Sequence, residues 1–314
     1  MVGVNENEFI LADRIAKIQS VIEKYQEDNF YISFSGGKDS CVLSKLIDVA
    51  LPSNNIPRVF CNTGIEYIMI VDFVKKLQTD DPRIQIILPR VPIKKMLEED
   101  GYPFKSKNHS ECVKTWRNNH DSLWAKKYVE GGYNFSSNTC PSVLNYQFSD
   151  DFTLKISDDC CKNLKEKPLS KWQQENNRPY GILGLMREEG GRRESAQCMA
   201  FAGNKLKNFQ PLVAITKEWE TWFIDQYDVE LCDLYKPPYN LERTGCVGCP
   251  FNPRLQKTLD ILAEKMPNER KKCEYIWKPV YEEYRRIGYR LRPNECEGQM
   301  SIFDLLEDGQ VYRG

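Results

Sequence analysis

The stretch that most constrains this chain is residues 31–51, "YISFSGGKDSCVLSKLIDVAL", in which two glycines join an apolar run to an amphipathic pattern. The apolar run is typical of a buried strand, and the apolar residues after Asp39 recur at helical spacing. A glycine turn between them directs backbone N–H groups, a helix N-terminus and Lys38 to one point, as in phosphate sites. The predicted phosphate loop consists of Ser35, Gly36, Gly37, Lys38, Asp39 and Ser40.

Strands and helices are predicted to alternate around this loop. Apolar spacing indicates an amphipathic helix over residues 8–27, strands at "RVFCN" and "IQIILP", and a helix between those strands. Further strands are expected at "PYGILGLM" and "NFQPLVAI", and a long helical stretch at about 255–287. This order is typical of a parallel sheet covered on both faces. We therefore expect a doubly wound, mostly parallel α/β fold with an additional helical C-terminal part.

The expected organisation is a nucleotide-binding domain over 1–252 with an irregular insertion at about 90–178, a helical extension over 253–292 and a flexible tail over 293–314. The chain has 314 residues, of which 41% are hydrophobic and 28% charged, as in ordinary globular proteins. Its formal net charge of −1 gives no general attraction to nucleic acid. No apolar run or signal-peptide pattern indicates a membrane, so we expect a cytoplasmic protein.

Two cysteine pairs are candidate metal ligands. Cys160 and Cys161 are adjacent, and Cys246 and Cys249 form a C-x-x-C motif. Together they supply four thiolates, which suit either tetrahedral zinc or an iron–sulfur cluster. The more isolated cysteines are interpreted as small core residues: Cys41, Cys61, Cys198, Cys232 and Cys273.

Several motifs resemble a known family. "SGGKDS" after an apolar strand resembles the PP-loop of the adenine-nucleotide α-hydrolase group, whose ATP-using members cleave between the α- and β-phosphates. "FCNTGIEY", "LGLMREEGGRRES", "NFQPLVAITKEWETWFI" and "YNLERTGCVGCPF" resemble further segments of the PAPS reductase family, so the resemblance covers most of residues 28–252. Beyond the loop, it implies that the nucleotide is bound by Ser33, Asn62, Thr63, Gly64, Gly184, Arg187 and Arg193.

One of these motifs departs from the family pattern. Met186 occupies the usual arginine position, and Gly190 replaces a serine. The candidates for binding the distal phosphate or sulfate are therefore Arg187, Arg192 and Arg193, because guanidinium groups suit such anions. Arg192 is also a candidate catalytic residue, together with Lys38 and Asp39 of the loop.

The first cysteine pair lies in a segment similar to the cluster-binding branch of the sulfonucleotide reductases. "CC-x-x-L-K-x-x-P-L" matches that branch at Lys165, Pro168 and Leu169, whereas Leu164 stands where arginine is usual. The resemblance implies a [4Fe-4S] cluster with Lys165 near its sulfurs. Its implied ligands are Cys160, Cys161, Cys246 and Cys249.

Sulfonucleotide reduction is one reaction that the resemblance implies. A protein thiolate attacks the sulfur of APS or PAPS, and a thioredoxin-like reductant releases sulfite. Family members of this kind usually have a degraded PP-loop and a C-terminal E-C-G-L-H motif. The tail "NECEGQM" offers Cys296 as the candidate nucleophile, but Glu295 and Glu297 oppose the lowered thiol pKa that a nucleophile requires.

ATP-dependent sulfur transfer is the alternative that the intact loop favours. ATP, with Mg²⁺ on its phosphates, would adenylate an acceptor, and a cysteine-desulfurase-type donor would supply sulfur. Relatives of this kind act in DNA phosphorothioation and tRNA thiolation, so a nucleic-acid acceptor is one candidate, although the net charge does not indicate it. A third alternative is a nucleotide-binding module without turnover, in which the cluster is structural.

Overall fold

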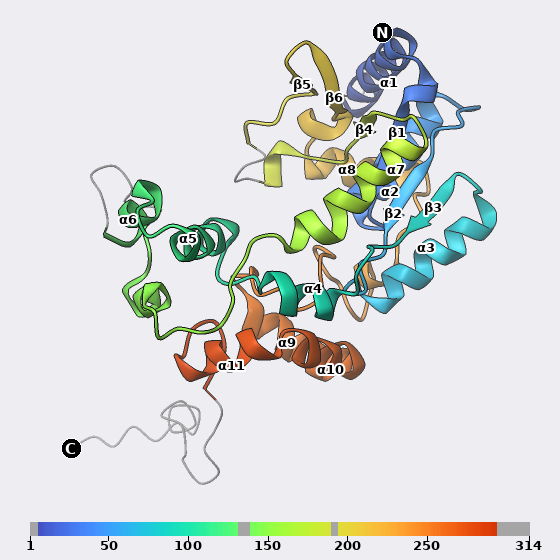
Figure 1. Cartoon of the computed structure of the whole chain (residues 1–314). Coiled ribbons are helices and arrows are strands. Elements are labelled where there is room, and N and C mark those ends of the chain that lie inside the picture. Colours follow the sequence, from blue (N-terminus) through green and yellow to red (C-terminus); the bar gives the residue numbers. More distant parts are fainter. Residues whose placement is uncertain (1–5, 131–138, 190–193, 294–314) are drawn as a thin grey trace. The chain divides into compact units, whose positions relative to one another are not determined.

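The computed structural model describes residues 6–130, 139–189 and 194–293 (Figure 1). The expected tail over 293–314 lies almost wholly outside these residues. The chain divides into two compact units. The first, here called the sheet unit, takes its residues from Met1–Met96 and Cys161–Val247. The second, here called the helical unit, takes its residues from Leu97–Cys160 and Gly248–Gly314.

A six-stranded sheet forms the centre of the sheet unit, in the order β3-β2-β1-β4-β6-β5. Its strands are β1 (Phe30–Phe34), β2 (Arg58–Cys61), β3 (Ile84–Ile87), β4 (Tyr180–Ile182), β5 (Met199–Ala202) and β6 (Lys205–Phe209). The pairings are parallel except that β5 runs antiparallel to β6. Ile32 of the central strand pairs with Arg58 on one side and Ile182 on the other. The predicted mostly parallel α/β fold is confirmed.

Helices cover both faces of this sheet. They are α1 (Glu6–Tyr25), α2 (Lys38–Ala50), α3 (Ile68–Asp80), α7 (Lys167–Glu175) and α8 (Lys217–Gln226). Right-handed crossovers put α2 and α3 on one face, and α1 and α8 pack against α2. The other face is covered by α7, which lies in front of the sheet in Figure 1. There Trp172 and Leu169 pack against Tyr31 and Val59 of the strands.

The strand order reverses direction beside β1, which has β2 on one side and β4 on the other. In open parallel sheets, the crevice at such a point, at the carboxyl ends of the strands, is where ligands bind. Residues 35–37 leave β1 at this edge and lead directly into α2. The predicted phosphate loop therefore lies where this kind of sheet binds its ligands.

The helical unit contains α5 (Lys107–Asn118), α6 (Leu123–Glu130), α9 (Leu255–Lys265), α10 (Pro267–Ile276), α11 (Lys278–Arg286) and the C-terminal part of α4 (Ile93–Asp100). The long helical stretch expected at 255–287 is three helices, because Pro267 and Pro279 each lie in the first turn of a new helix. In the core of this unit, His109 bonds Tyr128 at 3.0 Å and Gln147 at 2.8 Å. Burial lowers the pKa of His109 to about 4, so its ring is neutral at pH 7.

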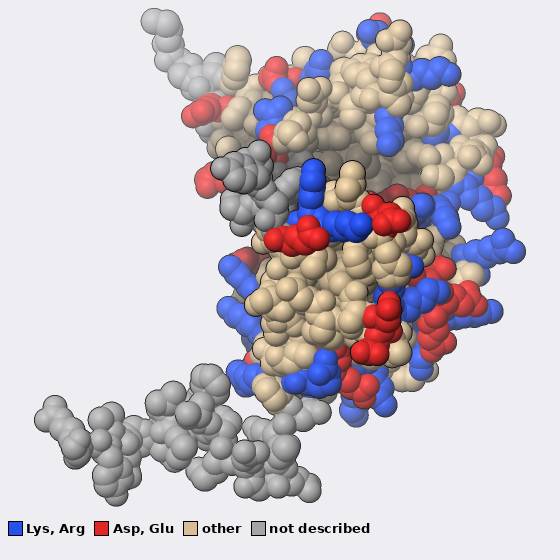
Figure 2. All heavy atoms as spheres, turned by 60° about the vertical axis from the view of Figure 1, so that its left-hand side comes forward, with Lys and Arg blue, Asp and Glu red and all other residues tan. Residues whose placement is uncertain are grey.

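The described residues also form shorter helical turns: η1 (Glu27–Asn29), η2 (Ser142–Phe148), η4 (Arg187–Glu189), η6 (Pro211–Ala214), η7 (Asp233–Tyr235) and the π-helical segment η3 (Lys162–Glu166). On the face shown in Figure 2, Lys and Arg side chains lie among Asp and Glu side chains. Oppositely charged side chains of the described residues form ion pairs such as Lys76–Glu230, at 2.6 Å. Within the described ranges, no helix is both long and apolar enough to cross a membrane.

Candidate functional site

The phosphate loop turns tightly between β1 and α2. Gly36 has a φ of +67°, a left-handed backbone conformation that residues with a side chain adopt only at a cost in free energy. A Cβ atom on Gly36 would lie 2.8 Å from Val74 Cγ2 and 3.0 Å from Ile70 Cγ2 of α3. The turn therefore depends on the absence of a side chain at this position.

Three backbone N–H groups of the loop donate to side-chain hydroxyls. The N–H of Ser35 donates to Ser40 Oγ at 3.2 Å, and that of Gly37 to Ser35 Oγ at 3.3 Å. The N–H of Lys38, the first residue of α2, donates to the Tyr235 hydroxyl at 3.0 Å. The acceptors are side-chain hydroxyls and not backbone groups, so a phosphate oxygen that displaces one of them gains the corresponding N–H donor.

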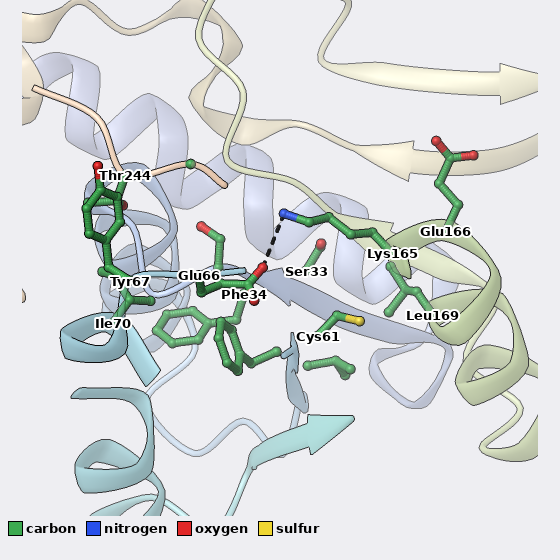
Figure 3. Close-up of a pocket in the computed structure, with 14 residues that line it drawn as sticks. Ser33, Phe34, Cys61, Glu66, Tyr67, Ile70, Lys165, Glu166, Leu169 and Thr244 are labelled. Atoms are coloured by element: carbon green, nitrogen blue, oxygen red, sulfur yellow. Dashed lines mark ion pairs between the residues drawn. The ribbon is translucent and has the colours of Figure 1, made fainter. Parts of the chain in front are cut away.

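Two pockets of about 250 Å³ each adjoin the loop. The first, here called the phosphate pocket, is lined by Gly37, Lys38, Asp39, Ser40, Gly184, Tyr235 and Arg243, among others. The second, here called the Lys165 pocket, lies beside the ends of β1 and β2, and its walls include Phe34, Cys61, Tyr67 and Leu169 (Figure 3). Ser33, Ser35 and Thr244 line both pockets, so one extended ligand could occupy the two together.

Lys38 is paired with a buried carboxylate beside the phosphate pocket. Its Nζ lies 2.7 Å from Glu220 Oε2 of α8, and the Glu220 side chain is 1% exposed, against 27% for Lys38. Glu220 Oε1 is buried and has no hydrogen-bond partner among the described residues. Burial raises the pKa of Glu220, Lys38 opposes this shift, and Asp39 reinforces it. Glu220 therefore forms an ion pair with Lys38, although burial deprives its carboxylate of hydration.

Replacing Glu220 with glutamine is expected to stabilise the protein at pH 7 by about 1 kcal/mol, because it removes a buried charge with an unbonded oxygen. A carboxyl whose pKa is higher in the folded than in the unfolded chain destabilises the fold once it ionises. The advantage of Glu220→Gln should therefore shrink as the pH falls toward the ordinary glutamate pKa of about 4.3. Urea unfolding between pH 4 and 8 measures this difference.

The control for this substitution is Asp225→Asn, which changes an exposed acid on the same helix. It is expected to leave the pH profile unchanged. If the advantage of Glu220→Gln instead grew as the pH fell, the sign assigned to the Glu220 pKa would be wrong.

The Lys165 pocket places an ion pair beside the end of β2. Lys165 Nζ lies 3.5 Å from Glu66 Oε1, and the two side chains point toward each other in Figure 3. Burial lowers the pKa of Lys165, but Cys246, Glu66 and Cys161 outweigh burial and raise it. Lys165 belongs to the π-helical segment η3, and such segments are frequent at functional sites. The pocket therefore combines apolar walls with a fixed cation.

The four predicted cysteine ligands are divided between the units. Cys161 and Cys246 belong to the sheet unit, whereas Cys160 and Cys249 belong to the helical unit. The two thiols of the sheet unit share Lys165 as a cationic neighbour. In the part of the chain that the structure describes, no three His, Cys, Asp or Glu side chains form a metal site. The thiol chemistry of the set fits an iron–sulfur cluster, and the four-ligand site stays a prediction.

The motif "FCNTGIEY" contributes to the site through different residues from those expected. Neither Asn62, Thr63 nor Gly64 is among the described residues that line the two pockets. Thr63 is buried, and both its N–H and its hydroxyl donate to Glu66 at 2.9 Å. Thr63 thus orients Glu66, which lines the Lys165 pocket with Tyr67.

The motif "LGLMREEGGRRES" contributes Gly184 to the phosphate pocket. A Cβ atom there would lie 3.0 Å from the backbone oxygen of Asp39, so glycine permits this close approach. Arg187 is exposed, and its Nε donates to Ala196 O at 2.8 Å, away from the described pocket lining. Arg192 and Arg193 lie outside the described residues, as does Cys296.

Several lining residues were not expected from the sequence. Tyr235 and Thr244 line the phosphate pocket, and Glu220 pairs with Lys38 beside it. The motif segments quoted above include Thr244 and Glu220, but none of the three was singled out as a site residue. Cys61, expected in the core, is half-buried and lines the Lys165 pocket. Its Sγ donates to Leu164 O at 3.1 Å, and burial raises its pKa to about 11. The position of Cys61 at the carboxyl end of β2 was the signal available for this placement.

Three proteins are among the solved structures that resemble this chain. A phosphoadenylyl-sulfate reductase from Candida auris, in a phosphate complex, has 12% identity and a TM-score of 0.39, covering 66% of this chain and 76% of that chain. An NH3-dependent NAD synthetase from Campylobacter jejuni, in complex with nitrate, has 12% identity and a TM-score of 0.42, covering 88% and 95%. A U34-tRNA thiolase from Methanococcus maripaludis, with its [4Fe-4S] cluster, has 14% identity and a TM-score of 0.39, covering 87% and 79%.

Sequence comparison gives the family. An uncharacterized protein of Methanocaldococcus jannaschii is 30% identical over 255 residues, which are 76% of this chain and 48% of that protein. The chain thus spans about half the length of the curated relative that it matches. Residues 29–124 and 134–252 match the phosphoadenosine phosphosulfate reductase domain. This match covers more than half of the chain, which therefore belongs to the phosphoadenosine phosphosulfate reductase domain family.

Proposed function

We propose that this chain is an iron–sulfur enzyme that binds ATP and couples cleavage between its α- and β-phosphates to sulfur transfer. The observation that carries the proposal is the complete loop from Ser35 to Ser40, with Lys38 and Asp39 lining the phosphate pocket at the N-terminus of α2. A triphosphate requires several N–H donors and a cation at one place. This loop supplies both, because Lys38 and the first N–H groups of α2 are directed at the same pocket.

The two adjoining pockets support an adenine nucleotide as the ligand. The phosphate pocket offers backbone N–H groups and Lys38, which suit a polyphosphate. The Lys165 pocket offers walls such as Phe34, Tyr67 and Leu169, which suit a flat base. Because Ser33 and Ser35 line both, the ribose and α-phosphate would lie near these two residues.

In the proposed reaction, an oxygen of the acceptor attacks the α-phosphorus of ATP. The bond from that phosphorus to the bridging oxygen breaks, and pyrophosphate leaves with the electron pair. Lys38 and the N-terminal amides of α2 would stabilise the charge that develops on pyrophosphate. Hydrosulfide, which is already at the oxidation level of sulfide, then attacks the acceptor atom that carries the adenylated oxygen, a carbon in a tRNA base or the phosphorus in DNA. The bond from that atom to the adenylated oxygen breaks, AMP leaves with the electron pair, and the hydrosulfide proton passes to solvent. Mg²⁺ would accompany the phosphates.

An iron–sulfur cluster, when bound, would supply a thiolate-ligated iron site for the chemistry of sulfur. Its proposed ligands are Cys160, Cys161, Cys246 and Cys249. Cys161→Ser and Cys246→Ser are each expected to lose most of the bound iron and acid-labile sulfide after anaerobic reconstitution. Cys198→Ser, which changes an isolated cysteine, should retain both. Zinc bound in the same stoichiometry, without sulfide, would favour a zinc site instead.

Sulfonucleotide reduction is the second candidate, and the family match favours it. It would require APS or PAPS as the nucleotide, a nucleophilic thiol such as Cys296, and a thioredoxin-like reductant. A nucleotide-binding module without turnover would bind ATP through the same loop and leave it unchanged.

The test measures pyrophosphate release from ATP and sulfite release from APS and PAPS with a dithiol reductant, on anaerobically reconstituted protein. Candidate acceptors, tRNA and DNA, are supplied in the ATP assay. We expect pyrophosphate release that depends on the acceptor, and we expect no sulfite release. Sulfite release would establish reduction, with Cys296→Ser as the next variant. Tight binding of ATP that stays intact for hours with every acceptor would support the non-catalytic module.

A further inference from the structure

Tyr235 joins the phosphate loop to the segment that carries Cys246. Its hydroxyl oxygen accepts a hydrogen bond from the Lys38 N–H at 3.0 Å. The same hydroxyl lies 2.5 Å from Thr244 Oγ1. Thr244 precedes Cys246 by two residues, and all four residues belong to the sheet unit. One phenol therefore bridges the start of α2 and a cysteine-bearing segment far away in sequence.

Tyr235 accepts a hydrogen bond from an N–H group that a bound phosphate also needs. The first N–H groups of a helix have no partner within the helix, and they are the usual donors to phosphate oxygens. Lys38 is the first residue of α2, and both Lys38 and Tyr235 line the phosphate pocket. The Tyr235 oxygen therefore occupies a position that suits a phosphate oxygen.

The surroundings restrict how this hydroxyl can respond. A Cβ atom on Gly37 would lie 3.3 Å from both the Tyr235 and the Thr244 hydroxyls, so the two are packed together over the loop. The backbone of Tyr235 is held in η7, where its N–H donates to Cys232 O at 3.0 Å. Movement of the Tyr235 hydroxyl must therefore change its bond to Thr244, which lines both pockets.

We propose that Tyr235 is a positioning residue that couples phosphate occupancy to Cys246. A phosphate oxygen takes over the Lys38 N–H, the Tyr235 hydroxyl is displaced, and the segment from Thr244 to Cys246 changes position as their hydrogen bond rearranges. Only hydrogen bonds are exchanged in this step. The inference rests on the proposed function, because it requires the phosphates of a nucleotide at the loop.

The test compares the reactivity of Cys246 with and without inorganic pyrophosphate, in the full chain kept free of metal. Iodoacetamide labelling of Cys246 is followed by peptide mass spectrometry, with Cys198 as the internal reference. Calorimetry measures pyrophosphate and ATP binding separately. Pyrophosphate is expected to change the Cys246 labelling rate of the wild type by about fivefold or more, the usual range of coupling between sites, and to leave Cys198 unchanged.

Tyr235→Phe removes the bridging hydroxyl and keeps the ring. The variant is expected to bind pyrophosphate as tightly as the wild type or about two- to tenfold more tightly, because no hydroxyl competes for the Lys38 N–H. Its Cys246 labelling rate should no longer respond to pyrophosphate. Thr244→Val should lose the response in the same way, whereas Thr244→Ser, which keeps a hydroxyl, should retain it. Tyr239→Phe is the matched control and should behave like the wild type.

Four results would overturn the inference. An unchanged response in Tyr235→Phe would show that the bridge carries no coupling. Binding more than tenfold weaker in that variant would make Tyr235 a phosphate ligand rather than a group that phosphate displaces. A wild type that binds pyrophosphate without a change at Cys246 would remove the link and leave the proposed function intact. Failure of the wild type to bind either pyrophosphate or ATP would overturn both.

Discussion

Replacing Lys38 with alanine is expected to weaken ATP binding by about 10- to 100-fold, while the iron content of the reconstituted protein stays at the wild-type value. A hydrogen bond from a charged group to phosphate contributes about 1.5–3 kcal/mol, and each 1.4 kcal/mol is about tenfold in affinity. Lys38 lines the phosphate pocket, whereas the proposed cluster ligands are cysteines elsewhere in the chain. Calorimetry with ATP and iron analysis of the same preparation measure both.

The same substitution has a second expected consequence, for stability. Alanine removes the cation that lies 2.7 Å from the buried carboxylate of Glu220. A buried charge left without its partner lowers the free energy of unfolding, here by about 1–3 kcal/mol. The double variant Lys38→Ala/Glu220→Gln removes both charges, so it should recover this stability. It should not recover affinity for ATP, because the cation that meets the phosphates is still absent.

Lys45→Ala, on the same helix, is the matched control and should change neither affinity nor stability by much. Unchanged ATP affinity in Lys38→Ala would mean that the phosphates do not reach this lysine, and the proposed function would lose its main support. Loss of iron in that variant would mean that the nucleotide and cysteine sites are not separable. Recovery of affinity in the double variant would assign the effect to an uncompensated Glu220 charge instead.

The central sheet and the phosphate loop are predictable because their signals are local. The loop residues are consecutive, and the strand before them and the helix after them have clear apolar periods. Even the division of the last helical stretch had a local signal, since Pro267 and Pro279 favour the first turn of a helix. The edge strand β5 was not expected, because a short strand that pairs only with β6 carries little pattern of its own.

The surroundings of Lys38 are not predictable in this way. Tyr235 contacts Lys38 across 197 residues of sequence, and Glu220 reaches it because α8 packs against α2. A hydroxyl or carboxylate that becomes functional only through such packing has the same local sequence signal as any other. Family resemblance likewise indicated Asn62 and Thr63, but in the described fold Thr63 supports Glu66, and Glu66 lines the pocket.

Replacing Gly36 with alanine is expected to lower the free energy of unfolding by about 2–5 kcal/mol and to abolish measurable ATP binding. Two costs add. A side chain at a φ of +67° costs about 1–2 kcal/mol, and a Cβ atom 2.8 Å from Val74 Cγ2 overpacks the contact with α3 by about 1–3 kcal/mol. Relief of either cost requires the loop to move, and the loop amides would then no longer converge on a phosphate.

Gly203→Ala separates the two costs. Gly203 has a similar φ of +59°, but a Cβ atom there would meet no other described atom within 4 Å. Its replacement should therefore cost only the conformational part, about 1–2 kcal/mol, and leave ATP binding unchanged. Urea unfolding of both variants gives the difference as the packing part. Equal losses would mean that α3 accommodates the added methyl group without strain.

A double-mutant cycle assigns the packing part to a specific contact. Val74→Ala alone should destabilise the protein, because it removes buried methyl groups. In the Gly36→Ala background the same change also removes the atom nearest the new Cβ, so it should cost less than it does in the wild type. A coupling energy near zero would place the strain elsewhere in the turn. A favourable coupling energy would show that the phosphate loop keeps its shape because α3 packs directly against a residue without a side chain.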